Sequence, residues 1–380
     1  MVFSYLYIEN YTVFWYPCQY RKEAHTLKRN YGIDLLRITA MFFVAALHII
    51  GIGGIITGSA LLSPQFLTAQ FLRIAMLCAV NCYALISGFV GWDKKPRLSG
   101  LLILWLRAVL FCLFATLFFS RNHNLDHKTW LSVLLPVTTG QYWYLTAYAG
   151  LFVLMPLLNL AVEKMPKREL TVTLGGILLL FSVFPISPLT DAFYLHDGYS
   201  VLWLAVMYLL GGYLGKYDTL SRFSLRCWGL LYLGAVLFAW APRMIVLWLK
   251  PHYWYDAYGN ILIEYTSPTI VLAAVSLVAI FSRMRLSESA GKVISRLSGG
   301  AFGIYLAHAH PLVFRFLLEN RFAHLGTATL PVLTGTVLGA ALGICLAGLL
   351  HDWTLTKCIL TPLLRLLRID RLLKKLDSLL

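Results

Sequence analysis

The sequence predicts an all-α fold, a polytopic integral membrane helix bundle of about ten transmembrane helices. Of its 380 residues 59% are hydrophobic and only 13% are charged, and the mean hydropathy is +0.72. Ordinary soluble domains do not have this composition. The apolar residues also gather in segments of about the length that a bilayer requires of a helix. The ten segments are 33–53, 66–91, 98–119, 141–160, 170–186, 200–214, 226–248, 261–281, 301–318 and 328–350.

The first apolar segment carries an acid, a base and an imidazole, which are costly inside a membrane and usually functional. Arg37 and His48 are 11 residues apart, which is close to three helical turns. They therefore project from one face, about 16 Å apart in height. Asp34 precedes Arg37 by three residues, close enough to neutralise it. This helix presents a charge pair near one membrane surface and a titratable histidine near the other.

The distribution of Lys and Arg predicts that both termini lie in the cytoplasm. With the N-terminus inside, the inner segments contain 23 basic residues and the outer loops contain four. Basic residues accumulate in the cytoplasmic loops of membrane proteins. The same bias accounts for most of the net charge of +15, so the charge does not indicate a nucleic-acid partner.

The chain divides into one membrane domain with two flanking segments. Residues 1–30 are predicted to form a cytoplasmic or interfacial arm, because the first twenty contain no Lys or Arg and do not resemble a signal peptide. No linker interrupts residues 31–355, which form the membrane domain. Residues 356–380 alternate leucines with basic residues and are expected to lie on the lipid of the inner leaflet as an amphipathic helix. The seven cysteines are mostly inside apolar segments and indicate core positions instead of disulfides.

Two outer loops, around 187–200 and 250–260, are rich in aromatic and acidic residues. Such side chains stack on sugars and hydrogen-bond to them. An aromatic belt at the membrane interface explains the same composition, and both interpretations stay open.

Four stretches of the span region stand out as motifs. They are Gly-Ile-Asp-Leu-Leu-Arg at 32–37 followed by His48, Asn-Cys-Tyr-Ala-Leu-Ile-Ser-Gly-Phe at 81–89, Gln-Tyr-Trp-Tyr-Leu at 141–145 and Ala-Phe-Gly-Ile-Tyr-Leu-Ala-His at 301–308. In the same order they resemble the acyltransferase family 3 membrane proteins, which O-acylate surface glycans, and the resemblance covers most of the span region. It implies an acyl-CoA donor, usually acetyl-CoA, on the cytoplasmic side of a bacterial plasma membrane, and a hydroxyl acceptor, usually a sugar, near the far side.

His48 is the candidate general base. Acyl transfer from a thioester to a hydroxyl needs a group that takes the hydroxyl proton, and a histidine near neutral pKa is the usual choice. The alternative is a histidine that is hydrogen-bonded in the bundle core. Arg37 could bind a phosphate or the pantetheine carbonyl of coenzyme A, or it could serve only as the structural partner of Asp34.

Coenzyme A carries several phosphates, so its cytoplasmic entrance should be basic. Lys94, Lys95 and Arg97 follow the second span, although cytoplasmic loops contain such charges with or without a ligand. Arg73 and Arg107 lie inside spans, where a charge is costly, and are candidates for that reason.

Trp143 and Tyr144 are candidates to line the acceptor path, with a role in the aromatic belt as the alternative. The resemblance alone implies that His308 positions the substrate or supports the residues that contact the substrate. His308 and His310 form a His-x-His pair that no carboxylate or cysteine ligand accompanies, so no metal site is predicted.

Two other functions compete with a membrane O-acyltransferase. A transporter or flippase of a lipid-linked or small polar substrate would also carry charged residues within spans. A ligand-binding sensor domain is the third alternative. The sequence leaves open the acceptor, the acyl length and the oligomeric state.

Overall fold

The fold was analysed in a computed structural model, which describes residues 29–184, 191–249, 262–366 and 369–378. Within these ranges the chain is helical and contains no strand, as the sequence predicts. The arm predicted at 1–30 and the loop at 250–260 lie almost wholly outside the described residues. The helices are α1 Tyr31–Ile50, α2 Ile55–Gly58, α3 Pro64–Met76, α4 Ala79–Gly91, α5 Leu98–Ser120, α6 His127–Leu134, α7 Trp143–Lys164, α8 Lys167–Leu178, η1 Leu179–Val183, η3 His196–Gly198, α9 Val201–Lys216, η4 Thr219–Arg222, α10 Leu225–Leu249, α11 Pro268–Ser282, α12 Glu288–Gly299, α13 Ala301–His308, α14 Pro311–Val313, η5 Phe314–Leu318, η6 Ala323–Thr327, α15 Leu330–Thr354, η7 Leu355–Leu360, α16 Thr361–Leu366 and α17 Ile369–Asp377.

Within the described ranges, six helical stretches are long and apolar enough to cross a membrane. A seventh span results if α12–α13 and α14–η5, which meet at a bend of 59°, are counted as one. Helices α9 and α11 are apolar but shorter. Each of the ten predicted segments contains helix, but the predicted count of ten spans is not confirmed. The six stretches are 31–58, 64–91, 98–120, 143–164, 225–249 and 330–366.

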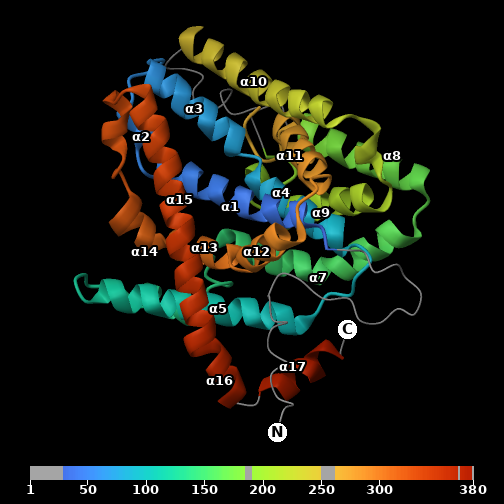
Figure 1. The fold of residues 1–380 in the computed structure, drawn as a ribbon, viewed down its shortest axis with the longest axis vertical. Coiled ribbons are helices and arrows are strands. Elements are labelled where there is room, and N and C mark those ends of the chain that lie inside the picture. Colours follow the sequence, from blue (N-terminus) through green and yellow to red (C-terminus); the bar gives the residue numbers. More distant parts are fainter. Residues whose placement is uncertain (1–28, 185–190, 250–261, 367–368, 379–380) are drawn as a thin grey trace.

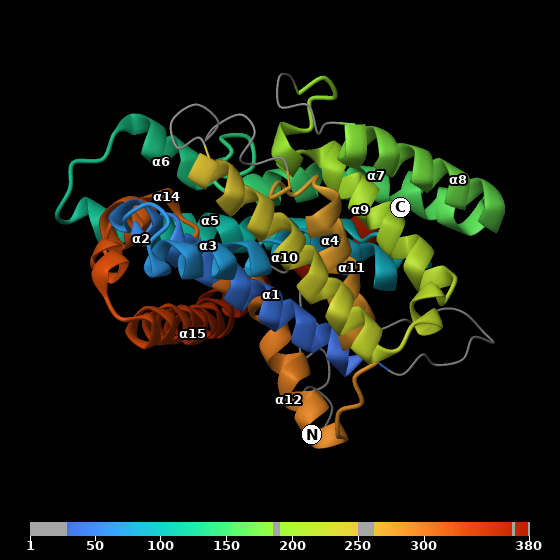
Figure 2. The same ribbon diagram turned by 90° about the horizontal axis from the view of Figure 1, so that it is seen from above.

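Helix α1 crosses the middle of the bundle and packs against α3, α4, α11, α12, α13 and α15 (Figures 1 and 2). Its N-terminus is capped by Asn30, whose side-chain oxygen accepts a hydrogen bond from the backbone N–H of Ile33 at 3.1 Å. The Asn30 amide also donates to the carbonyl of Ser282 at the end of α11, at 2.6 Å. The cap thus starts the helix and fixes its position against a neighbour.

Helix α9 lies closely against α4. The α-carbons of Gly88, Gly211 and Gly215 face backbone carbonyls of the opposite helix, and a β-carbon on any of them would come within about 2.3 Å of a carbonyl oxygen. Deeper in this interface, Trp203 donates its indole N–H to the side-chain oxygen of Asn81 at 3.0 Å. The Asn81 amide donates to the carbonyl of Tyr265 at 2.7 Å. The loop before α11 is therefore anchored inside the bundle at α4.

The loops predicted to be cytoplasmic lie at one end of the bundle, which we call the basic end. Hydrogen bonds tie the α4–α5 loop and the end of α9 to the end of α7, and tie the segment before α10 to the end of α11. The tail helix α17 joins them, because Asp377 accepts hydrogen bonds from the backbone and hydroxyl of Ser99. The other contacts are Asn159 to the carbonyls of Gly91 and Lys94, Lys216 to those of Val162 and Glu163, and Arg283 to those of Leu220 and Phe223.

At the opposite end, which we call the far end, the chain after α1 is held by the segment after η5. Asn320 donates its backbone N–H to the carbonyl of Ile52 at 3.0 Å, and Phe322 donates to that of Gly53 at 2.8 Å. These bonds fix the C-terminal part of α1 relative to α13, α14 and η5.

Candidate active site

Asp34 and Arg37 form the ion pair that their spacing predicts. Arg37 Nη1 lies 2.7 Å from Asp34 Oδ1, and the two side chains are 4% and 2% exposed. The other carboxylate oxygen lies 2.6 Å from Nε of Arg29, at the basic end. One carboxylate thus faces two guanidinium groups, a buried one from Arg37 and a partly exposed one from Arg29. Guanidinium groups attract an anionic ligand nearby.

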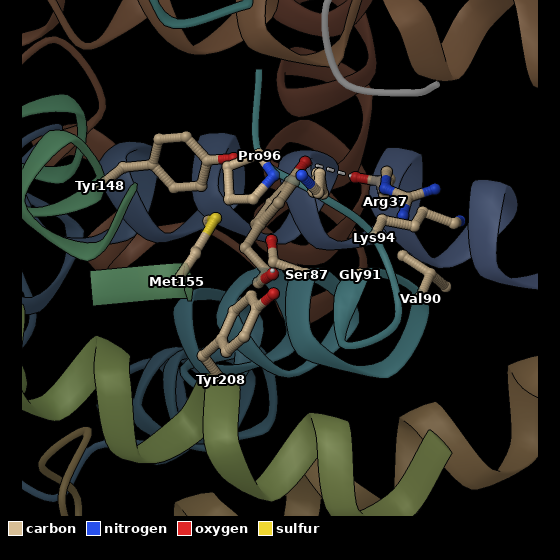
Figure 3. A pocket seen from close by; sticks show the side chains of 11 residues that line it. Arg37, Ser87, Val90, Gly91, Lys94, Pro96, Tyr148, Met155 and Tyr208 are labelled. Carbon is tan, nitrogen blue, oxygen red and sulfur yellow. Dashed lines mark hydrogen bonds between the residues drawn. The ribbon is translucent and has the colours of Figure 1, made fainter. Parts of the chain in front are cut away.

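A pocket opens beside this cluster at the basic end (Figure 3). It encloses about 610 Å³ of space, including a part open to solvent. One wall is aromatic: the Tyr83 hydroxyl donates to the carbonyl of Arg37 at 2.6 Å, and the Tyr208 hydroxyl donates to Asn159 at 2.8 Å. The pocket combines basic and phenolic groups. Its lining consists of Arg37, Tyr83, Ser87, Val90, Gly91, Lys94, Lys95, Pro96, Tyr148, Met155 and Tyr208.

Among the predicted donor-binding residues, the structure brings Arg37 and Lys95 to this pocket, together with Lys94. Arg97, which precedes α5, does not line it. Neither does Arg73, whose charge instead acts on the phenol of Tyr265. The roles predicted for these residues stay predictions.

Arg107 also lies away from the pocket and is paired with Asp352 of α15. Both side chains are at most 9% exposed, and the guanidinium lies over the ring of Phe302, 5.4 Å from its centre. Gly303 makes room for the carboxylate, since a β-carbon there would fall 2.2 Å from the Asp352 β-carbon. This arrangement accounts for a buried arginine without any ligand.

His48 and His308 lie side by side, with ring centres 5.1 Å apart. The ring of Phe314 meets the His48 ring edge-on at 4.8 Å. Nδ1 of His308 is 2.6 Å from the carbonyl oxygen of Ile304. Nδ1 of His48 and Nε2 of His308 are enclosed, and neither has a hydrogen-bond partner in the part of the chain that the structure describes. Two imidazole rings, each with an enclosed nitrogen that lacks such a partner, thus lie next to each other inside the bundle.

A row of aromatic rings connects the pocket with the two histidines. The ring-centre distances are 6.2 Å from Tyr83 to Tyr144, 6.4 Å from Tyr144 to Tyr305 and 6.5 Å from Tyr305 to His308. The Tyr305 hydroxyl also accepts the backbone N–H of Tyr144 at 3.3 Å. Along α1 itself, Arg37 and His48 are separated by about 16 Å.

Trp143 begins α7 within a second aromatic cluster. Its ring centre lies 4.5 Å from that of Tyr199 and 6.2 Å from that of Tyr265, and the two tyrosines are 4.9 Å apart. Tyr199 belongs to the outer loop that the sequence marks as aromatic and acidic. The predicted acceptor residues Trp143 and Tyr144 therefore join the far-end loop to the row of rings that ends at His308.

Apart from Tyr144, sequence reasoning did not identify the tyrosines that line the pocket and connect it with His308. Tyr83 and Tyr305 lie inside stretches that carry the family resemblance, and Tyr148 follows Tyr144 by one helical turn, so a signal existed for these three. Nothing in the sequence distinguishes Tyr208 from other tyrosines. Across the described ranges, no group of three or more His, Cys, Asp or Glu side chains could hold a metal ion.

Comparison with known proteins identifies a family. The family model of acyltransferase family 3, described as an acyltransferase domain, matches residues 30–352. This range runs from the cap of α1 to Asp352 of α15 and includes the pocket, the row of rings and both histidines. No curated protein and no solved structure matches the chain significantly. Because the family model covers most of the 380 residues, the chain belongs to the acyltransferase family 3 proteins and is a multi-helix membrane protein of that family.

Proposed function

We propose that this protein is an O-acyltransferase of the plasma membrane, which moves an acyl group, usually acetyl, from cytoplasmic acyl-CoA to a hydroxyl of a glycan or lipid-linked sugar. The observation that carries the proposal is the connection between a basic pocket at one end of α1 and a histidine pair farther along the same helix. Both termini and the basic end face the cytoplasm in this proposal, in agreement with the 23 basic residues of the predicted inner segments.

The donor enters at the basic end. Lys94 and Lys95 lie at the mouth of the pocket, where ammonium groups attract the phosphates of coenzyme A. The guanidinium of Arg37, which is paired with Asp34, is a further basic group in the lining of this pocket. The pantetheine arm then extends along the row of tyrosine rings and delivers the thioester to His48. The rise of α1 between Arg37 and His48 requires an extension of about 16 Å.

His48 acts as the general base. A ring nitrogen of His48 takes the proton of the acceptor hydroxyl while the hydroxyl oxygen attacks the thioester carbonyl carbon. The C–S bond breaks, and its electron pair leaves on the sulfur of coenzyme A. The proton then passes from the imidazolium to this thiolate, so the enzyme returns to its starting state. Asp34 has no direct part in this step, because it is already shared by two arginines.

The acceptor approaches from the far end. Trp143, Tyr199 and Tyr265 form a cluster of rings on which a sugar can stack, and Tyr144 continues the cluster toward the histidines. Arg73, near Tyr265, belongs to this side in the proposal, and Arg107 serves as the structural partner of Asp352.

The test is the transfer of labelled acetyl from acetyl-CoA by the purified protein in lipid. His48→Gln should lower turnover by about 10²–10⁴-fold, because the amide can hydrogen-bond but cannot take the proton. Donor binding should be largely retained. His123→Gln, in the loop after α5, is the matched control and should keep its turnover. A folded His48→Gln variant with normal transfer would refute the assignment of the base.

A transporter remains the second candidate, because one helix pair is broken. The 59° bend between α13 and α14 falls next to His308 and precedes Pro311, and broken helices line substrate paths in transporters. Proteoliposomes separate the two functions. Movement of a lipid-linked sugar without acyl-CoA favours a transporter, whereas labelled product that forms only with acyl-CoA favours the enzyme.

A further inference from the structure

We infer that His308 sets the tautomer of His48 through a chain of hydrogen bonds that begins at the carbonyl of Ile304, so that Nε2 of His48 is the nitrogen that takes the acceptor proton. The inference deepens the proposed function and rests on it for the role of His48. The position of the protons in the chain, however, is a property of the protein that can be measured without substrate.

The first link fixes His308. A carbonyl oxygen can only accept a hydrogen bond, and Nδ1 of His308 lies 2.6 Å from the carbonyl oxygen of Ile304. Nδ1 must therefore carry the hydrogen, and Nε2 of the neutral ring must carry a lone pair. The carbonyl itself is held in place, because Gly348 lets α15 approach so closely that a β-carbon there would lie 2.7 Å from the Ile304 α-carbon.

The second link joins the two histidines. Two imidazole rings connected by an N–H···N bond of about 2.9 Å have centres about 5 Å apart, since each nitrogen lies about 1.1 Å from its ring centre. The ring centres of His48 and His308 are 5.1 Å apart. Nδ1 of His48 and Nε2 of His308 are the two enclosed nitrogens without a partner among the described residues. In the structure no hydrogen bond joins these two nitrogens. In the inferred state the rings turn so that the two nitrogens pair, and only His48 can then be the donor.

The third link determines the base. A neutral imidazole has one N–H, so a His48 ring that donates through Nδ1 has its lone pair on Nε2. Nδ1 of His48 is enclosed, so the inference assigns the contact with a bound hydroxyl to Nε2. When Nε2 takes the hydroxyl proton, the imidazolium continues to donate through Nδ1 to the lone pair of His308. The oxygen attacks the thioester carbon, the sulfur leaves with the electron pair of the C–S bond, and the Nε2 proton passes to the thiolate.

The surroundings keep the two rings next to each other. Phe314 packs edge-on against the His48 ring. The backbone hydrogen bonds from Asn320 and Phe322 to the segment after α1 hold the end of this helix against the chain that follows η5. His308 is thus a positioning residue, which acts through His48 and does not itself touch the acceptor.

The experiment combines two variants of His308 with a direct reading of the tautomer. His308→Gln can still donate to the Ile304 carbonyl through its amide and accept from His48 through its oxygen. His308→Phe keeps a ring but has no nitrogen. We expect His308→Phe to lower kcat by about 10²-fold or more with an unchanged KM for acetyl-CoA, and His308→Gln to recover most of the rate.

Solid-state NMR of the ¹⁵N-histidine-labelled protein in lipid, without substrate, reads the tautomers. The His48 signal is assigned by its loss in His48→Gln. We expect a hydrogen on Nδ1 of His48 in the unmodified protein and in His308→Gln, and a loss of this preference in His308→Phe. A hydrogen on Nε2 of His48 in the unmodified protein would overturn the inference even if His308→Phe did not fold. A fully active His308→Phe variant would overturn it as well.

These readings separate the two proposals. If the protein transfers no acyl group but the His48 hydrogen lies on Nδ1 and depends on His308, the chain of hydrogen bonds stands and the proposed function fails. If transfer depends on His48 but the hydrogen lies on Nε2, the proposed function stands and the inference fails.

Discussion

Removal of the Asp352 charge should strongly destabilise the bundle if Arg107 is a structural residue. Asp352→Asn keeps the shape of the side chain beside Gly303 but leaves the guanidinium of Arg107 without a counter-charge. Both side chains are at most 9% exposed, so water cannot replace the lost partner. Breaking a buried ion pair by removing one partner costs about 3–5 kcal/mol. We expect this loss in the free energy of unfolding.

The double variant makes the prediction specific. Arg107→Gln with Asp352→Asn replaces two buried charges by two neutral groups that can hydrogen-bond, so it should be more stable than Asp352→Asn alone. The coupling between the two sites should reach about 2–3 kcal/mol, as for residues in direct contact. Glu163→Gln is the matched control, because its partner Lys164 is 69% exposed and a surface pair contributes about 0–1 kcal/mol.

Unfolding in mixed micelles, followed by tryptophan fluorescence, measures these free energies, and calorimetry measures the binding of acetyl-CoA to each variant. The structural role predicts normal donor binding by the folded double variant. The reasoning fails if Asp352→Asn is as stable as the unmodified protein. It also fails if Arg107→Gln abolishes donor binding without a loss of stability, and Arg107 would then hold the donor as the sequence predicts.

One further prediction concerns the basic end of the bundle. Lys95→Ala should weaken the binding of acetyl-CoA about two- to fivefold and reduce its salt dependence, whereas Lys164→Ala, outside the pocket, should not. Equal Kd values in a filter-binding titration would contradict the donor site.

Local spacing allowed part of the site to be predicted from the sequence. Asp34 and Arg37 are three residues apart in one helix, so their contact follows from helix geometry alone, and the structure confirms it at 2.7 Å. The projection of Arg37 and His48 from one face follows from the same geometry. The basic loops could also be predicted to share one side of the membrane. Lys and Arg accumulate in each cytoplasmic loop independently of the other loops. In each case the chain segment contains all the information that the prediction needs.

Partners that are distant in the chain could not be predicted in this way. Asp352 lies 245 residues after Arg107, and no pattern in either segment indicates the other. Without its partner, Arg107 resembles a ligand-binding residue, because an unpaired charge inside a span is costly. The same difficulty applies to His308, whose position beside His48 depends on how α13 packs against α1. Periodicity determines the face of a helix that is buried but not the helix that covers it.

The number of spans in the structure differs from the predicted ten for a related reason. The difference shows where the aromatic loops lie in the bundle. Hydropathy identifies α9 and α11 as apolar but does not show how deep in the bundle they begin. Gly211 of α9 contacts Leu85 of α4, and Gly215 contacts Phe89. Counted back along both helices, the first residue of α9 therefore lies level with about residue 75. Helix α3 begins at Pro64, about 16 Å farther out. The bond from Asn81 to the carbonyl of Tyr265 places the loop before α11 at a similar depth. Irregular backbone is tolerated at such depth where it is buried in protein or lines a water-filled space. The aromatic cluster of Trp143, Tyr199 and Tyr265 therefore lies inside the bundle, level with α4, and not at the outer ends of the long helices.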